Sequence, residues 1–397
     1  MITTKTSKTE GLKLVLLIIV VSQFCCTSLW FAGNSVLTDL VLNFDLTETA
    51  LGYLTASIQF GFISGTLVFA TLTITDRFAP SKVFFLSALM AAIFNLGLIW
   101  TSNSMFSLSV FRFATGFFLA GIYPVGMKIA ADYFEIGLGR SLGFLVGALV
   151  LGTAFPHLLK GVSYGFSWQT IVYATSGLAL LGGLLMLGLV PNGPYRKASS
   201  VLNFSAFYSV FKNRAFRAAA FGYFGHMWEL YAFWAFVPVM LHTYIGLHPD
   251  MSLDSLVYTF LIIGSGGVAC VISGYLSRIF GVRQIATIAL SLSGLCCLLS
   301  PLLFMQDSLA LFLMFLLFWG MVVIADSPMF STLVAQNASR ELKGTALTIV
   351  NCIGFGITII SIQIMSFMVS NSSPIYSYTL LGIGPLFGIV HLLKNKP

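Results

Sequence analysis

Basic residues in this chain of 397 residues occupy alternate gaps between about twelve apolar stretches. Positive residues near the ends of membrane spans stay on the cytoplasmic side. Of the 20 Lys and Arg residues, Lys160 alone lies in an opposite gap and Arg112 alone lies within a stretch. The pattern therefore predicts a multi-pass protein of the cell inner membrane, with both termini and the long middle loop in the cytoplasm. The other basic residues are Lys5, Lys8, Lys13, Arg77, Lys82, Lys128, Arg140, Arg196, Lys197, Lys212, Arg214, Arg217, Arg278, Arg283, Arg340, Lys343, Lys394 and Lys396.

The composition agrees with a lipid environment. Charged residues make up 8% of the chain and its mean hydropathy is +0.94, whereas a soluble domain carries roughly 25% charged residues. We assign the net charge of +7 to loops facing anionic lipid headgroups, so nucleic acid is not an expected partner. The six cysteines all fall in apolar runs without metal-ligand spacing, and we expect no metal and no cofactor.

Twelve transmembrane helices in two six-helix bundles are the expected architecture of this all-α membrane protein. A crossing needs about 20 apolar residues. Segment 191–214 contains two prolines, a glycine and several basic residues. It is therefore the expected cytoplasmic linker between an N-terminal bundle (1–190) and a C-terminal bundle (215–397). Helices are expected near 12–33, 50–74, 82–101, 104–128, 139–161, 168–190, 215–242, 253–277, 283–305, 308–332, 343–369 and 374–393.

The two halves also look like copies of one another. Three pairs of residues recur at one spacing, 204 positions apart, and similar basic loops follow the second and eighth helices. A duplicated six-helix unit explains both observations, and such repeats are typical of transporters that rock two bundles about a central site. The recurring pairs are Trp30 with Trp234, Gly116 with Gly320 and Pro124 with Pro328.

Three short motifs carry a family resemblance. They are Asp76-Arg77 with Lys82 after the second helix, Arg112 with Gly116 in the fourth, and Gly143 with Gly152 in the fifth. On these motifs the chain resembles the major facilitator superfamily (MFS) over essentially its whole length. It departs from the family pattern at Leu72, where the loop motif has glycine, and at Pro156, where the antiporter motif has the glycine of its Gly-Pro pair. The resemblance implies the two-bundle MFS fold, and we expect a monomer.

His226 and Glu229 are the sharpest candidates for proton coupling. Three residues apart on one helix, they are expected on the same face, with Glu229 near the bilayer midplane. Burial disfavours the ionised form of an acid, and a neighbouring histidine exchanges protons near neutral pH. The pair is therefore expected to couple protons or bind substrate. The alternative is a neutral hydrogen-bonded pair that only holds helices together.

Asp326 and Arg112 are the other intramembrane charges. Asp326 precedes Ser327 and Pro328, and an acid beside a proline hinge is expected either to switch partners during transport, with Lys128 as one conceivable partner, or to staple two helices. For Arg112 the resemblance implies a relay or gating role. The alternative is an arginine that extends to the outer headgroups.

Aromatic and amide side chains are expected to line a substrate cavity. Tyr231 and Trp234 share a helix with Glu229, and rings with polar edges suit an organic solute. Asn34, Gln59 and Asn351 lie on other helices and either join this cavity or bond between helices.

The loop residues Asp76, Arg77 and Lys82 resemble a conformational latch on the cytoplasmic face. A latch of this kind holds one conformer shut. The alternative is that these residues only set topology.

Secondary active transport is the predicted function. No phosphate-binding loop for ATP is present, and acids with aromatics favour a neutral or cationic organic solute. We expect proton-coupled symport across the inner membrane by alternating access. Efflux by proton antiport is the alternative within this class, and a non-transporting sensor or scaffold is the alternative outside it. No nucleophile or metal set accompanies His226 and Glu229, so we do not expect an enzyme.

Overall fold

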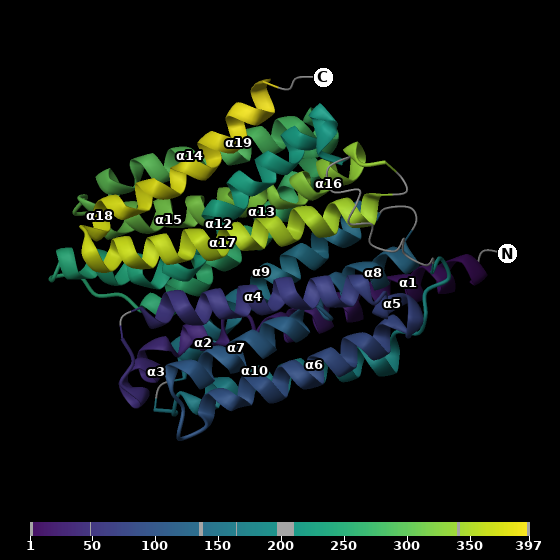
Figure 1. Cartoon of the computed structure of the whole chain (residues 1–397), viewed down its shortest axis with the longest axis horizontal. Coiled ribbons are helices and arrows are strands. Elements are labelled where there is room, and N and C mark those ends of the chain that lie inside the picture. The colour runs from purple at the N-terminus through teal and green to yellow at the C-terminus, as the bar shows by residue number, and fades with distance from the viewer. Residues whose placement is uncertain are drawn as a thin grey trace.

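The computed structural model of the chain describes residues 3–47, 49–134, 138–163, 165–196, 210–339 and 342–394, and every regular element in these residues is helical (Figure 1). The helices lie roughly parallel, and the N- and C-termini lie at the same end of the molecule (Figure 1). The elements are α1 (Thr3–Thr27), α2 (Ala32–Ser35), α3 (Leu37–Phe44), α4 (Ala50–Thr71), α5 (Ile74–Arg77), α6 (Pro80–Leu96), η1 (Gly97–Ile99), α7 (Met105–Leu119), α8 (Tyr123–Tyr133), α9 (Leu138–Val162), α10 (Gln169–Leu189), α12 (Arg214–Leu247), α13 (Ser255–Phe280), α14 (Val282–Phe304), α15 (Leu309–Ala325), α16 (Ser327–Asn337), α17 (Lys343–Asn371), α18 (Pro374–Ser377), η2 (Tyr378–Gly382) and α19 (Ile383–Lys394).

Eleven helical segments in the described residues are long and apolar enough to cross a membrane. The twelfth expected crossing corresponds to α1, whose apolar part Leu12–Thr27 is shorter. Polar side chains cap the N-termini of several helices. The side chains of Asn213, Asp254 and Ser308 accept hydrogen bonds from the first free N–H groups of α12, α13 and α15. The fold expected from the sequence is confirmed.

Three of the expected helices are not continuous, so their expected ranges are wrong in the middle. The first helix ends at Thr27 and resumes as α2 at Ala32, instead of running to residue 33. The fourth is broken between α7 and α8, and the tenth between α15 and α16. Pro124 and Pro328 lie in the first turn after the last two breaks, where a missing N–H costs no hydrogen bond.

The two halves repeat the same close helix contact. A Cβ atom added to Gly116 of α7 would lie 2.0 Å from the carbonyl oxygen of Ile58, and one added to Gly320 of α15 would lie 2.2 Å from that of Ile262. Gly116 and Ile58 correspond to Gly320 and Ile262, each 204 positions later in the sequence. No residue larger than glycine fits at either crossing. The duplication inferred from sequence therefore extends to packing.

The two halves meet along α9 with α13 and along α4 with α17. At the end away from the termini the contact is tight, since a Cβ on Gly161 would lie 2.9 Å from Val257 Cγ2 and one on Gly52 would lie 2.9 Å from Ser366 Oγ. Toward the terminal end, Gly143 of α9 and Gly274 of α13 have open space around the corresponding position. The halves are therefore sealed most closely at the end opposite the termini.

The expected domain boundary falls between α10 and α12. Residues 197–209 of the expected linker 191–214 lie outside the described residues, so the boundary itself stays a prediction. The start of the linker contacts the first half, because the N–H of Tyr195 donates to the carbonyl oxygen of Asp132 at 3.0 Å.

Candidate functional site

A cluster of buried aromatic rings joins the two halves at their interface. Trp30 follows the end of α1 and stacks on Tyr231 of α12, with ring centroids 5.8 Å apart. The ring centroids of Phe62 on α4 and Phe355 on α17 lie 4.6 Å apart, and those of Tyr231 and Trp234 lie 5.3 Å apart. The members, all at most 6% exposed and called the aromatic cluster below, are Trp30, Phe31, Phe62, Tyr231, Trp234 and Phe355.

Polar atoms around the aromatic cluster are buried without partners in the described structure. They include the indole nitrogens of Trp30 and Trp234, both amide atoms of Gln59, and both ring nitrogens of His157. Gln59 lies three residues before Phe62 on the same face of α4, and the His157 ring centroid lies 6.3 Å from that of Phe31. Unsatisfied buried groups are uncommon in folded proteins, so this concentration marks a place for a ligand or water.

Asn34 and Asn351 lie at the edges of this region. The Asn34 amide donates to Thr55 Oγ1 at 2.9 Å, which joins α2 to α4. Asn351 is half-buried on α17, four residues before Phe355 and therefore on the same face. The structure thus brings the five predicted cavity residues toward one interface, and their contact with a solute stays a prediction.

His226 and Asp326 form a buried pair at a helix break. Nδ1 of His226 on α12 lies 2.7 Å from Oδ1 of Asp326 between α15 and α16, and both side chains are at most 1% exposed. The approach has the distance of an ion pair without the angles of a hydrogen bond, and neither side chain has another hydrogen-bond partner among the described residues. The pair therefore keeps polar atoms available to a proton or water.

Glu229 lies in the interior of the second half. Oε1 accepts hydrogen bonds from Trp319 Nε1 at 2.7 Å and from Cys297 Sγ at 3.3 Å, and Oε2 accepts one from Ser293 Oγ at 2.8 Å. These donors come from α14 and α15, so three donors surround a carboxyl group that is 1% exposed.

The expected local pairing on α12 is corrected by these contacts. His226 lies against Asp326, and the described hydrogen bonds of Glu229 go to α14 and α15 instead of one helical turn back to His226. Lys128, named above as a conceivable partner of Asp326, instead lies 2.9 Å from Asp76. Spacing on one helix placed the groups correctly but did not specify which neighbouring helix each side chain faces.

Arg112 is fully buried and supports the break in the first helix. Its Nη1 donates to the carbonyl oxygen of Leu29 at 3.1 Å, and its Nη2 donates to that of Trp30. Helix ends leave carbonyl groups without intrahelical partners, and the guanidinium supplies donors there. The extension to the headgroups considered above is wrong, since the side chain is 0% exposed. A relay or gating role stays a prediction.

The predicted latch residues lie at the terminal end of the molecule. Asp76 on α5 forms a 2.9 Å ion pair with Lys128 on α8, inside the first half, while Arg77 and Lys82 are exposed. Arg196 Nη2 donates to the carbonyl oxygen of Asp76 at 3.1 Å. Leu72, in the motif's glycine position, has φ −81°, and the left-handed residue is Thr73 at φ 49°. The turn therefore forms without the motif's glycine.

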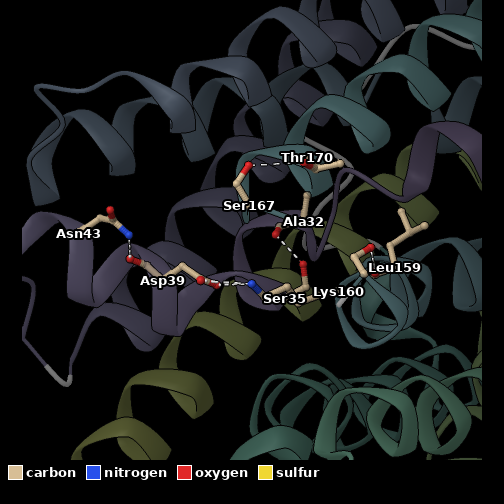
Figure 2. Close-up of polar contacts among 9 residues, drawn as sticks. Ala32, Ser35, Asp39, Asn43, Leu159, Lys160, Ser167 and Thr170 are labelled. Atoms are coloured by element: carbon tan, nitrogen blue, oxygen red, sulfur yellow. Dashed lines mark hydrogen bonds and ion pairs between the residues drawn. The ribbon is translucent and has the colours of Figure 1, made fainter. Parts of the chain in front are cut away.

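A second ion pair lies at the opposite end (Figure 2). Lys160 on α9 is 2.9 Å from Asp39 on α3, and the Asn43 amide donates to the Asp39 carbonyl oxygen at 2.7 Å. Lys160 is the single basic residue in the gaps that alternate with the basic ones in the sequence, and its ion pair joins two elements of the first half.

His157, Trp319 and Ser293 are not among the residues predicted from sequence. His157 follows Pro156 in an apolar run. Its position inside a predicted membrane span was the one feature of the sequence that could have pointed to it. Trp319 and Ser293 become recognisable as partners of Glu229 through tertiary packing alone. Within the described residues, no group of three His, Cys, Asp or Glu side chains lies close enough to hold a metal ion.

Two bundles of helices, most of them long and apolar enough to cross a membrane, define the class of protein as a multi-pass membrane protein. Residues 19–362 match the sequence profile of the Major Facilitator Superfamily. The chain therefore belongs to this superfamily, as the motifs predicted. Members of this superfamily and fold are generally not enzymes. No curated protein matches the chain by sequence.

Solved transporters of the superfamily share the fold. The chain is similar to the proton:xylose symporter XylE bound to 6-bromo-6-deoxy-D-glucose, with a TM-score of 0.75 and 14% identity over 98% of this chain and 96% of that one. It is also similar to a bacterial homolog of the human lysosomal transporter Spinster, in an inward-facing and unoccupied conformation, with a TM-score of 0.65 and 14% identity over 97% of this chain and 95% of that one. At this identity the likeness concerns the fold alone.

Proposed function

We propose that this superfamily member is a proton-coupled secondary transporter that moves a small organic solute across the inner membrane by alternating access. The aromatic cluster is the proposed solute site, because it lies where the two halves meet and is surrounded by unpartnered polar atoms. Symport is the proposed mode, and the proton-coupled xylose symporter of the same fold supports it. The termini are proposed to lie in the cytoplasm on the charge pattern alone.

The observation that carries proton coupling is the buried pair of His226 and Asp326 at a helix break. Charged side chains in a membrane interior are rare and mark functional positions, and this pair combines an acid with a histidine, whose ring nitrogens can accept and release a proton. A break in α15–α16 lets the two half-helices change their angle. The proton is therefore proposed to reside on this pair, with Glu229 as a second candidate.

The cycle follows from which end of the molecule is sealed. The halves pack tightly at the end away from the termini, so the present conformer is closed there. Opening that end requires α9 to separate from α13 and α4 from α17, the two contacts between the halves described above. The proposed latch at Asp76 would then stabilise closure at the terminal end.

Reconstitution into liposomes tests the proposal once a metabolite library screened by thermal shift has given a binding solute. We expect solute uptake against its gradient when the lumen is alkaline relative to the medium, and a solute-dependent acidification of the lumen reported by a trapped pH dye. After a protonophore has collapsed the gradient, the solute should only equilibrate across the membrane and no longer accumulate. Solute movement in the direction opposite to protons would replace symport by antiport, and binding without movement would favour a sensor.

A further inference from the structure

The charged groups near the centre are engaged with the protein itself. Arg112 donates to two backbone carbonyl groups, Asp326 lies against His226, and Glu229 accepts three hydrogen bonds. Around the aromatic cluster, the groups left without hydrogen-bond partners include the indoles of Trp30 and Trp234, the amide of Gln59 and the imidazole of His157, and none of these carries a permanent charge that could pair with an ionised solute. Burying a charge without a partner is far more costly than burying a neutral polar group with hydrogen bonds.

Neutral groups of the first half supply the unused hydrogen-bonding capacity. Gln59 and Thr66 lie on one face of α4, and Thr153 and His157 lie one turn apart on one face of α9. The amide of Gln59, the two hydroxyls and the imidazole of His157 are all buried without partners. Together they present donors and acceptors, whereas an indole N–H only donates.

His157 is the member of this set that the sequence motifs leave without a role. It is 1% exposed, and neither ring nitrogen has a partner among the described residues. Phe31, whose ring centroid is 6.3 Å from that of His157, lies 6.4 Å from that of Trp234 in the second half. A structural histidine in the membrane would normally spend both nitrogens on hydrogen bonds. This one faces the aromatic cluster with both unused.

We infer that the centre binds an uncharged ring compound bearing hydroxyl or carbonyl groups, with its ring against the aromatic cluster and its polar groups bonded to His157 and Gln59. The inference rests on the proposed function and specifies its substrate class. Flat apolar ring faces pack on aromatic side chains, and hydroxyl groups both donate and accept, as this set of partners requires. His157 is then a specificity-determining residue, since leaving it unbonded would penalise solutes without a matching group.

Matched neutral and charged compounds test the substrate class by thermal shift and equilibrium binding on the purified protein. The library contains pentoses, hexoses, inositols and nucleosides, with charged counterparts such as D-glucuronate and D-glucosamine beside D-glucose, and uridine monophosphate beside uridine. We expect stabilising compounds to be neutral and their charged counterparts to bind at least about tenfold more weakly. Charged compounds that bind as well as neutral ones would overturn the inference and leave proton-coupled transport intact. If no neutral ring compound binds, the inference falls, and failure of every compound in a wider metabolite library contradicts the proposed function as well.

Variants of His157 separate solute binding from a structural role. His157→Leu should weaken binding of the stabilising compound at least about tenfold, the value of one lost hydrogen bond, without lowering the melting temperature of the free protein, because His157 has no partner there to lose. His157→Asn, which keeps a donor and an acceptor, should recover part of the affinity. His242→Leu, at an exposed histidine of α12, is the control. Unchanged affinity in His157→Leu would overturn the assignment, as would equal losses of affinity and stability.

Discussion

The two halves of this transporter share a scaffold and differ in chemistry. Helix crossings recur with the same residues 204 positions apart, as at Gly116 on Ile58 and Gly320 on Ile262. The polar groups do not recur: the positions in the first half that correspond to His226 and Asp326 hold Ser22 and Ile122. Apart from Arg112, the buried groups without partners in the first half are neutral, whereas the second half holds His226 in contact with Asp326.

This difference indicates that the two copies of a duplicated unit can keep the same scaffold and acquire different functions. Duplication preserved what the bundle needs, which is glycine at the crossings and proline after the helix breaks. Each half was then free to change the side chains that face the centre. We therefore assign solute binding mainly to the first half and proton binding to the second, with Tyr231 and Trp234 completing the solute site from the second half.

The largest effect is expected from the acid that binds the proton. Asp326→Asn removes ionisation with little change of shape, so gradient-driven accumulation should be lost while exchange of solute across the membrane continues. The measurement is uptake into liposomes with and without an imposed pH gradient. Glu229→Gln is the matched variant: if its three hydrogen bonds serve structure, it should lower the free energy of unfolding by about 1–3 kcal/mol and keep accumulation.

The opposite result would reassign the proton. Loss of accumulation in Glu229→Gln with exchange retained, alongside a functional Asp326→Asn, would make Glu229 the coupling residue, as its position near the midplane first indicated. Loss of both accumulation and exchange in Asp326→Asn would place Asp326 in solute binding or folding. Asp307→Asn, at an acid of the second half that is 98% exposed, is the control for replacing a carboxylate by an amide.

The shared scaffold is tested by equal substitutions in each half. Gly116→Ala and Gly320→Ala place a methyl group against a backbone carbonyl, so each should destabilise the protein by about 1–3 kcal/mol, the usual cost of overpacking. Gly143→Ala and Gly274→Ala have open space and should change the melting temperature little. A strong effect at one crossing and none at the other would mean that the halves differ in packing as well as chemistry.

The number and positions of the helices were predictable because the membrane restricts them. A span must be apolar over about 20 residues, and basic loops mark its ends. Most expected ranges agree with the observed helices within a few residues, as for 343–369 against Lys343–Asn371. The break at residues 28–31 was not predictable, because nothing in Ser28-Leu29-Trp30-Phe31 disfavours a helix. It depends on Arg112, which is 82 residues further along the chain from Trp30.

The candidate site was predictable as a set of residues but not as a set of contacts. Intramembrane charges are few enough that His226, Glu229, Asp326 and Arg112 stand out in the sequence alone. Which helix each side chain faces depends on helix rotation and on partners such as Trp319, which no local pattern specifies. His157 escaped because a histidine beside a proline carries no spacing signal.

Substitution of Arg112 tests the assignment of solute binding to the first half. Arg112→Lys keeps the charge but replaces a two-pronged donor with a single ammonium group, so the carbonyl groups of Leu29 and Trp30 would no longer both be held. We expect solute affinity to fall by about 1–2 kcal/mol, because Trp30 loses its fixed position, with proton dependence unchanged. Arg283→Lys, at a carbonyl contact in the second half, is the control. A changed proton dependence in Arg112→Lys would support the relay role instead.

The smallest effects are expected at the two ion pairs near the ends of the first half. Partly exposed pairs contribute about 0–1 kcal/mol, so neither Asp76→Asn nor Asp39→Asn should unfold the protein. Asp76 lies in the proposed latch with Lys128, whereas Asp39 binds Lys160 on the opposite side (Figure 2). Asp76→Asn should therefore slow transport and raise cysteine labelling at the terminal end, while Asp39→Asn should leave labelling there unchanged. If Asp76→Asn changes neither labelling nor rate, the loop motif serves topology alone, and the first half then contributes solute contacts without a gate of its own.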